Sequence, residues 1–127
     1  MSTNTIKYAE LNCLSNFTFL KSASHPQELV EQAAINGYYA VALTDECSFA
    51  GIVRAHSAAK KCGVKFIVGT VLKLIEGPEI ILLVNSISSY KEISKLITKA
   101  RRSQVKGSYQ LSLNDLIKIK NGLIIWK

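Results

Sequence analysis

The chain has 127 residues and a mass of 14.0 kDa, with 48% hydrophobic and 20% charged residues. This length predicts one domain over residues 1–127, and the composition excludes a disordered tail or linker, which would have too little apolar surface to bury. The net charge of +7 comes entirely from residues 64–127, so we expect that half to meet an anionic partner such as DNA. Net charge that serves solubility alone is the alternative interpretation.

The longest aliphatic run, Ile80 to Val84, is far shorter than the roughly 20 residues that cross a bilayer, so we expect no membrane partner. The N-terminal residues carry no export signal. Cys13, Cys47 and Cys62 are odd in number and widely spaced, which suits reduced thiols better than a disulfide framework. We therefore expect a cytoplasmic protein.

The first half of the chain predicts alternating strands and helices. In order these are an extended segment at 8–14, a helix at Pro26–Asn36, a strand at Tyr39–Thr44, a helix at Ala50–Cys62 and a strand at Lys65–Val68. Ser24 and Gln27 predict a capping box for the first helix, and Gly69 follows the third strand. Short joins and right-handed crossovers favour a parallel sheet flanked by helices.

The second half changes period after Gly69. Two runs separated by a Glu-Gly-Pro turn, Thr70–Ile75 and Glu79–Val84, predict an antiparallel hairpin. Ser89 with Glu92, and Ser112 with Asp115, are predicted capping boxes. The expected elements are a helix from Ser89 to about Ser103, a weaker helix from Ser112 to near Asn121-Gly122, and a last strand at Leu123–Trp126.

Candidate site residues follow the parallel strands, because ligands of α/β folds gather at the C-terminal ends of such strands. The set comprises 12–16, 44–47 and 69–71, with His25 at a helix start as a further candidate. It is too poor in His, Asp and Glu for metal-assisted hydrolysis. Asp45 and Glu46 are interpreted as a turn-shaping and surface pair, because successive strand side chains point apart. A zinc site of Cys13, Cys47 and His25 is disfavoured without a CxxC pair.

Basic residues recur at intervals of three or four along the predicted helix after Ser89. They are Lys91, Lys95, Lys99, Arg102 and Lys106. This spacing lines one helical face with cations, an arrangement that suits a phosphate backbone. A solvated face is the alternative interpretation, and no base-reading aromatic motif accompanies the stripe.

A family resemblance extends from ELNCL at 10–14 to VGT at 68–70. It includes SHP at 24–26, TDE at 44–46 and, later in the chain, SKLITKARR at 94–102. This part of the chain resembles the start of the PHP (polymerase and histidinol phosphatase) domain of bacterial DNA polymerase III alpha subunits, above all the error-prone branch. The resemblance implies an α/β fold, a partial PHP-type (β/α) barrel with a mainly parallel sheet and an added hairpin. It spans about the first half of a typical barrel and includes no polymerase palm.

The resemblance also implies where metal ligands would lie. The His-x-His positions are Asn12 and Leu14, an Asp position falls near Lys21, the His of Thr-Asp-His is Glu46, and a Glu position is Val71. Among these only Glu46 carries an ordinary metal ligand, since Asn is weak, Leu and Val cannot coordinate, and Lys repels a cation. The resemblance therefore implies a degenerate site without a metal cofactor.

Three functions are open at this point. The first is a non-catalytic module derived from, or acting with, an error-prone polymerase in DNA replication or repair. The second is a phosphoesterase with a rebuilt site around His25, Asp45 and Glu46, and the third is a free-standing nucleic-acid-binding protein. Because a partial barrel leaves strand edges unpaired, we also expect a symmetric homodimer.

Overall fold

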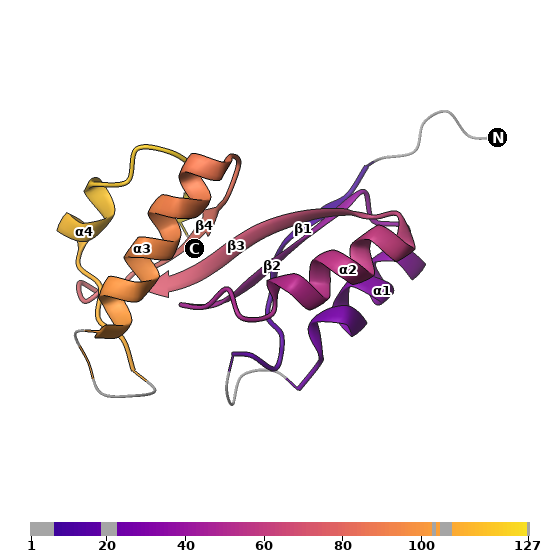
Figure 1. Cartoon of the computed structure of the whole chain (residues 1–127), viewed down its shortest axis with the longest axis horizontal. Coiled ribbons are helices and arrows are strands. Elements are labelled where there is room, and N and C mark those ends of the chain that lie inside the picture. The colour runs from indigo at the N-terminus through magenta and orange to yellow at the C-terminus, as the bar shows by residue number, and fades with distance from the viewer. Residues whose placement is uncertain (1–6, 19–22, 103, 105–107, 127) are drawn as a thin grey trace.

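The computed structural model describes residues 7–18, 23–102, 104 and 108–126. The elements in chain order are β1 (Ala9–Cys13), α1 (Pro26–Ile35), β2 (Ala40–Glu46), α2 (Ile52–Cys62), β3 (Lys65–Lys73), β4 (Glu79–Leu83), α3 (Ile87–Arg102), α4 (Leu113–Ile117) and β5 (Leu123–Trp126). One five-stranded sheet has the order β1-β2-β3-β4-β5. Figure 1 shows β1 to β4 of this sheet with the four helices. Strands β1 to β3 are parallel, and β4 and β5 each pair antiparallel with the preceding strand. The predicted α/β class with an added hairpin is confirmed.

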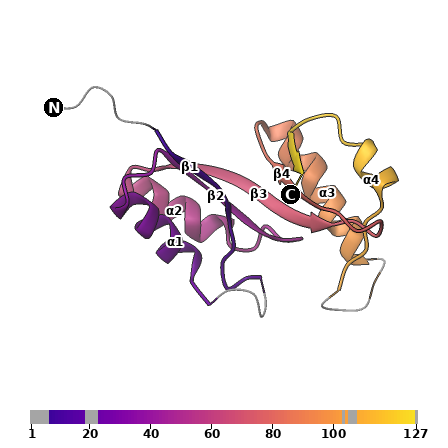
Figure 2. The same ribbon diagram turned by 180° about the vertical axis from the view of Figure 1, so that it is seen from behind.

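Helices α1 and α2 pack side by side against the β1–β3 half of the sheet (Figure 2). Small side chains, Ala55, Ala58 and Ala59, form the buried face of α2 and let it approach the sheet closely. They meet Val41 and Leu43 of β2 in one apolar cluster. This packing is the hydrophobic core of the N-terminal half.

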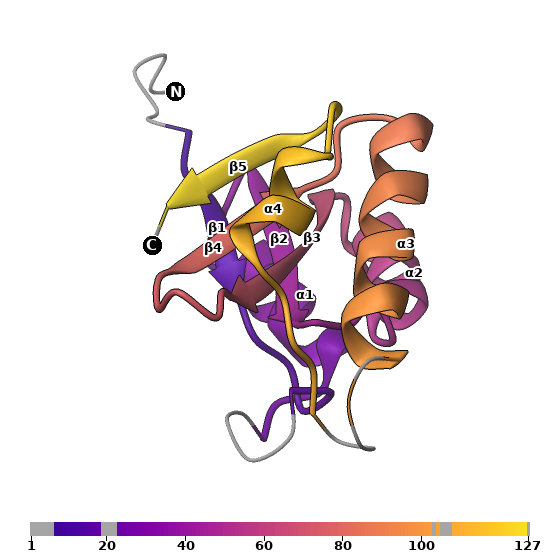
Figure 3. The ribbon, with the colours of Figure 1, turned by 90° about the vertical axis from the view of Figure 1, so that its left-hand side faces the viewer.

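The C-terminal half has its own core, in which α3 and α4 cover β3 and β4. Buried side chains from these elements form one cluster that includes Leu72, Ile80, Leu82, Ile93, Leu96 and Leu116. Phe66 and Leu72 are both on β3, and they pack in the N-terminal core and in this core respectively. Because alternate residues of a strand point to the same face, the two cores lie on one face of the sheet. All the long helices therefore cover the same face of the curled sheet, as the positions of α2 and α3 in Figure 3 show.

The opposite face of the sheet is apolar as well. Ala42, Val71, Ile81 and Leu83 form a third buried cluster there, with partly buried Leu11, Leu14, Ile67 and Ile125 packed against it. The sheet is thus a curled half-barrel with helices outside and aliphatic side chains inside.

Strand β3 differs from the sequence prediction, because it runs unbroken through Gly69. A Cβ atom at Gly69 would lie 2.8 Å from Leu83 Cδ2, 2.9 Å from Leu82 O and 2.9 Å from Thr44 Cγ2. The glycine marks a close approach of neighbouring strands and not a strand end. The predicted third strand and the first hairpin strand are therefore one element.

Two of the three predicted capping boxes are wrong. The N-cap of α1 is His25, whose side chain makes no capping hydrogen bond, and the Ser24 carbonyl accepts instead from Asn16 N–H. Helix α3 begins at Ile87 with a reciprocal pair: Ser89 N–H donates to Ser86 Oγ at 3.1 Å, and Ser86 N–H donates to Ser89 Oγ at 2.9 Å.

The third predicted capping box is confirmed at α4, where Ser112 and Asp115 bond reciprocally. The helix itself ends at Ile117, short of the predicted end near Asn121-Gly122. Glu92, predicted to cap α3, accepts from Lys120 N–H at 3.2 Å and Asn121 N–H at 3.0 Å. These bonds hold the chain between α4 and β5 in an irregular conformation.

In the described part of the chain, no helix combines the length and the apolar character that a bilayer crossing requires.

Candidate functional site

The described residues at the PHP metal-ligand positions lie at or near the C-terminal ends of β1, β2 and β3. Leu14 and Val71 pack in or against the inner apolar cluster, and Glu46 is the register partner of Val71 in the β2–β3 pair. Asn12 Oδ1 accepts from Thr44 Oγ1 at 2.8 Å, and that threonine is fully buried. Lys21, the remaining position, lies outside the described residues. The four described ligand positions thus hold two aliphatic side chains, one amide and one carboxylate.

Asp45 is not a surface residue, and the prediction that it belongs to a surface pair is wrong. Its side chain is 1% exposed because β2 continues through Glu46 and the strand alternation places Asp45 on the helix-covered face of the sheet, together with Val41 and Leu43. Its carboxylate accepts from Ser15 N–H at 2.6 Å, Ser15 Oγ–H at 2.6 Å and Thr18 Oγ1–H at 2.7 Å. Asp45 therefore fixes the turn after β1, and both of its carboxylate oxygens accept hydrogen bonds from the protein.

Glu46 contacts a tyrosine that the sequence analysis did not single out. Tyr109 Oη donates to Glu46 Oε2 at 3.2 Å and accepts from Lys73 N–H at 3.0 Å. Burial raises the pKa of Tyr109 well above its usual range, so its hydroxyl keeps its proton. No local pattern links positions 46 and 109, which meet only through the tertiary fold.

Arg101 is the second residue at this strand end that the sequence analysis missed. Its Nη2 donates to Glu46 O at 3.3 Å and to Cys47 O at 3.2 Å, and its Nε also reaches Cys47 O at 3.2 Å. Cys47 is 1% exposed, and burial raises the pKa of its thiol to about 11. A protonated, enclosed thiol is a poor metal ligand.

His25 lies at the start of α1, in the first-turn place that the sequence predicts, and its side chain is exposed. Its Nδ1 is 3.0 Å from Asn16 Nδ2, and its Nε2 is 4.0 Å from Glu28 Oε1. Burial raises the pKa of the Cys13 thiol to about 11. Across the described ranges, no group of three or more His, Cys, Asp or Glu side chains is placed to hold a metal ion.

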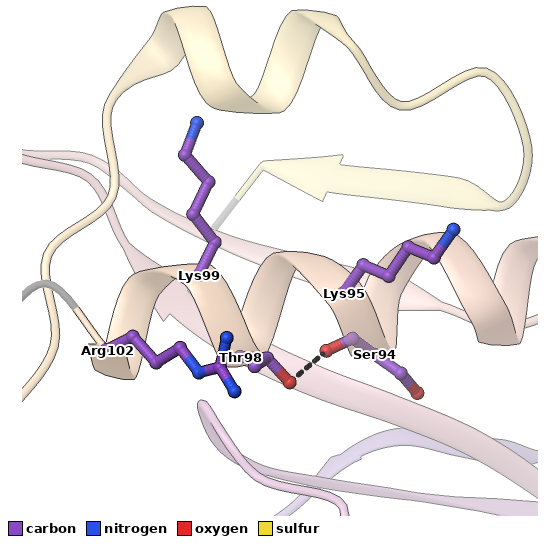
Figure 4. Close-up of a pocket in the computed structure, with 5 residues that line it drawn as sticks. All are labelled: Ser94, Lys95, Thr98, Lys99 and Arg102. Atoms are coloured by element: carbon purple, nitrogen blue, oxygen red, sulfur yellow. Dashed lines mark hydrogen bonds between the residues drawn. The ribbon is translucent and has the colours of Figure 1, made fainter.

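The stripe residues within α3, Lys91, Lys95, Lys99 and Arg102, are exposed, and Ile93, Leu96 and Ala100 on the opposite side of the helix are buried. The side chains of the stripe residues that the structure describes make different contacts. Lys99 Nζ contacts Asp115 Oδ1 at 2.6 Å and reaches toward α4, whereas Arg102 folds back along the helix toward Thr98 (Figure 4).

A groove of about 580 Å³ runs along this helix, lined by Ser94, Lys95, Thr98, Lys99 and Arg102. Of the remaining stripe residues, Lys91 is exposed outside this groove, and Lys106 falls outside the described part of the chain. Three cationic side chains, Lys95, Lys99 and Arg102, thus line the groove beside the hydroxyls of Ser94 and Thr98, and Lys99 is the one that pairs with Asp115.

A comparison with protein-family models matches residues 10–126 to the PHP domain. The chain belongs to the PHP domain family. The resemblance of the chain to the N-terminal region of error-prone polymerases is also confirmed. The chain is 51% identical over 126 residues to an error-prone DNA polymerase of Dechloromonas aromatica, and 50% identical over 122 residues to one of Saccharophagus degradans. These matches cover 94% and 95% of the chain, but it spans only 12% of the length of either relative.

Solved structures confirm the fold of this PHP domain. A protein assigned as a metal-dependent phosphoesterase from Bifidobacterium adolescentis superposes with a TM-score of 0.66 at 22% identity, over 80% of this chain and 36% of that one. An amidohydrolase from Chromobacterium violaceum superposes with a TM-score of 0.64 at 21% identity, over 75% of this chain and 34% of the other.

The described PHP positions do not fit the metal ions that the family resemblance implies. A di- or trivalent cation needs several anionic or imidazole ligands around it. Here Leu14 and Val71 belong to the apolar interior, the amide oxygen of Asn12 accepts from Thr44, and Glu46 is the single carboxylate. We therefore derive no chemistry from a metal at this site.

Proposed function

We propose that this chain is a non-catalytic, degenerate PHP module that works in the context of an error-prone DNA polymerase, in DNA replication or repair in the cytoplasm. The observation that carries the proposal is the composition of the strand ends. Glu46 is the single carboxylate among the described ligand positions, and its Oε2 accepts from Tyr109. A lone carboxylate in that setting cannot assemble a cation and an activated water.

Metal content and hydrolysis test this proposal directly. Purified protein should contain no stoichiometric zinc, manganese or iron by mass spectrometry, and should hydrolyse neither p-nitrophenyl phosphate nor single-stranded DNA with added Mn²⁺. The matched control for Glu46→Gln is Glu31→Gln, which makes the same charge change at an exposed position of α1. One bound metal per chain, with hydrolysis lost in Glu46→Gln and kept in Glu31→Gln, would contradict the proposal. That outcome would support the phosphoesterase alternative, which the described structural relative from Bifidobacterium adolescentis favours.

We propose the groove on α3 as a contact for the phosphates of DNA. Lys95 and Arg102 supply positive charge there, and Lys99 is partly neutralised by Asp115. Binding should weaken with salt by about 0.9 log units per log unit of salt for each duplex phosphate neutralised. The double variant Lys95→Glu/Arg102→Glu should lose binding, whereas Lys60→Glu/Lys61→Glu, an equal charge change on exposed residues of α2, should retain it. Equal binding by both variants would remove the groove from the proposal.

We also propose a homodimer, supported by the sheet topology. Strands β1 and β5 are the edges of the described sheet, and each presents one side of its backbone for further pairing. Light scattering across a dilution series should give about twice the chain mass of 14.0 kDa. A mass of one chain at every concentration would contradict the dimer.

A further inference from the structure

Two aromatic side chains extend the groove on α3 beyond its N-terminal end. Tyr90, in the first turn of the helix, stacks on Phe49 of the loop between β2 and α2, with ring centroids 5.2 Å apart and 12° between the ring planes. Tyr90 is 42% exposed, so Phe49 covers one face of its ring and solvent reaches the rest. We call this stacked pair the aromatic platform.

The aromatic platform is held in place from beneath. Phe49 packs against the buried cluster that α3 shares with β3 and β4. In its loop, Ser48 N–H donates to Thr70 Oγ1 at 3.3 Å, and Ala50 N–H donates to Ser48 Oγ at 3.0 Å. Because Thr70 is fully buried on β3, these bonds tie the loop to the centre of the sheet. Tyr90 therefore presents a ring that already has a fixed support.

The aromatic platform and the groove lie in one row along α3. Positions four residues apart are neighbours on a helix, and Tyr90 is followed at this spacing by Ser94, Thr98 and Arg102. Figure 4 shows these last three side chains along one side of the helix. With a rise of about 1.5 Å per residue, the row is about 18 Å long, which is about the length of five stacked nucleotides at 3.4 Å each.

The charges along this row favour an anionic ligand. Lys95 and Arg102 line the groove, and neither forms an ion pair with a carboxylate of the described ranges. None of the five lining side chains is itself a carboxylate. Proteins bind single-stranded nucleic acid by combining cations with aromatic rings, because each nucleotide carries a phosphate and every base has a flat face that can stack.

We infer that this face of α3 binds single-stranded DNA, with one base stacked on Tyr90 and neighbouring phosphates on Lys95 and Arg102. The inference rests on the proposed contact between the groove and DNA phosphates, and it names the form of DNA that the surface takes. A duplex keeps its bases stacked on one another and offers the groove its phosphates, so the aromatic platform strengthens the binding of a single strand alone.

The test measures, by fluorescence anisotropy, the affinity for a fluorescein-labelled strand of mixed sequence and for the same strand annealed to its complement. Tyr90→Ala should weaken binding of the single strand by about 5- to 150-fold, the usual effect of removing one stacking side chain, and should leave duplex binding within about twofold. Tyr90→Phe should bind both forms like the wild type, because stacking uses the ring and not the hydroxyl.

Two further variants separate stacking from a general effect on the fold. Tyr90→Leu keeps an apolar side chain against Phe49 but has no aromatic face, so it should lose single-strand affinity as Tyr90→Ala does. It also decides the question if Tyr90→Ala fails to fold. Tyr39→Ala is the matched control, because Tyr39 is 41% exposed and lies before the N-terminal end of β2, away from the loop of Phe49. It should bind both forms of DNA like the wild type.

Wild-type affinity of Tyr90→Leu for the single strand, or an equal loss toward both forms of DNA, would overturn the inference. Displacement of the strand by polyglutamate as readily as by unlabelled strand would also overturn it, because the surface would then bind any polyanion. Loss of both forms of DNA in Lys95→Glu/Arg102→Glu, with wild-type binding in the Tyr90 variants, would leave the proposed phosphate contact standing and refute the stacking. A wild type that binds neither form would refute both.

Discussion

The carboxylate of Asp45 is expected to be the most sensitive polar group in the N-terminal half, and Asp45→Asn tests this with almost no change in shape. Three donors, two from Ser15 and one from Thr18, lie 2.6–2.7 Å from its oxygens. Hydrogen bonds to a charged group contribute about 1.5–3 kcal/mol each, against about 0.5–1.5 kcal/mol for neutral pairs. In the Asp45→Asn variant the amide oxygen can keep the bonds from Ser15 N–H and Thr18 Oγ1–H without charge assistance, but the amide nitrogen cannot accept from Ser15 Oγ–H. Asp45→Asn should therefore lower the free energy of unfolding by about 3 kcal/mol.

Asp45→Ala should have a larger effect of about 3–5 kcal/mol, because the buried Ser15 N–H would lose its acceptor. Urea unfolding followed by far-ultraviolet circular dichroism gives these free energies, with an unchanged slope showing that the unfolded state is the same. Glu31→Gln is the matched control, since it removes the same charge from an exposed site. The reasoning is refuted if Asp45→Asn unfolds within about 0.5 kcal/mol of that control.

The remaining predictions concern three other features. Gly69→Ala should destabilise the protein by about 1–3 kcal/mol in urea unfolding, because its Cβ would lie 2.8–2.9 Å from neighbouring strand atoms; an unchanged midpoint would contradict this. In thiol titration at pH 8, exposed Cys62 should react first, because burial raises the pKa of both Cys13 and Cys47 to about 11; three equal rates would be the opposing result. The hydrogen bond from Lys99 lowers the pKa of Asp115 below its ordinary 3.8. The ionised Asp115 therefore stabilises the fold above that pH, and this stabilisation is lost as the pH falls through the lower pKa of the folded state. Asp115→Asn should flatten the decline in unfolding free energy between about pH 5 and pH 2, and an equally steep decline in the variant would count against this prediction.

Local patterns were sufficient for most of the fold. The helical spacing before Gly37, the apolar run from Tyr39 to Thr44 and the capping box of Ser112 with Asp115 each encode their element within a few residues. A prediction was wrong where contacts with distant parts of the chain require the residue. Gly69 appeared to end a strand, yet it is required by the approach of β2 and β4 from either side.

The sequence by itself also shows which metal ligands the PHP positions lack, because Asn12 and Leu14 stand where the family resemblance places histidines and no folding can change that. Only the tertiary structure decided what those strand ends do instead. Asp45 is buried against donors 27 and 30 residues away, and Arg101 reaches the end of β2 from 54 and 55 residues away. Such contacts leave no periodic trace in the sequence, since they depend on which strand end and which helix end the packing of the sheet brings together.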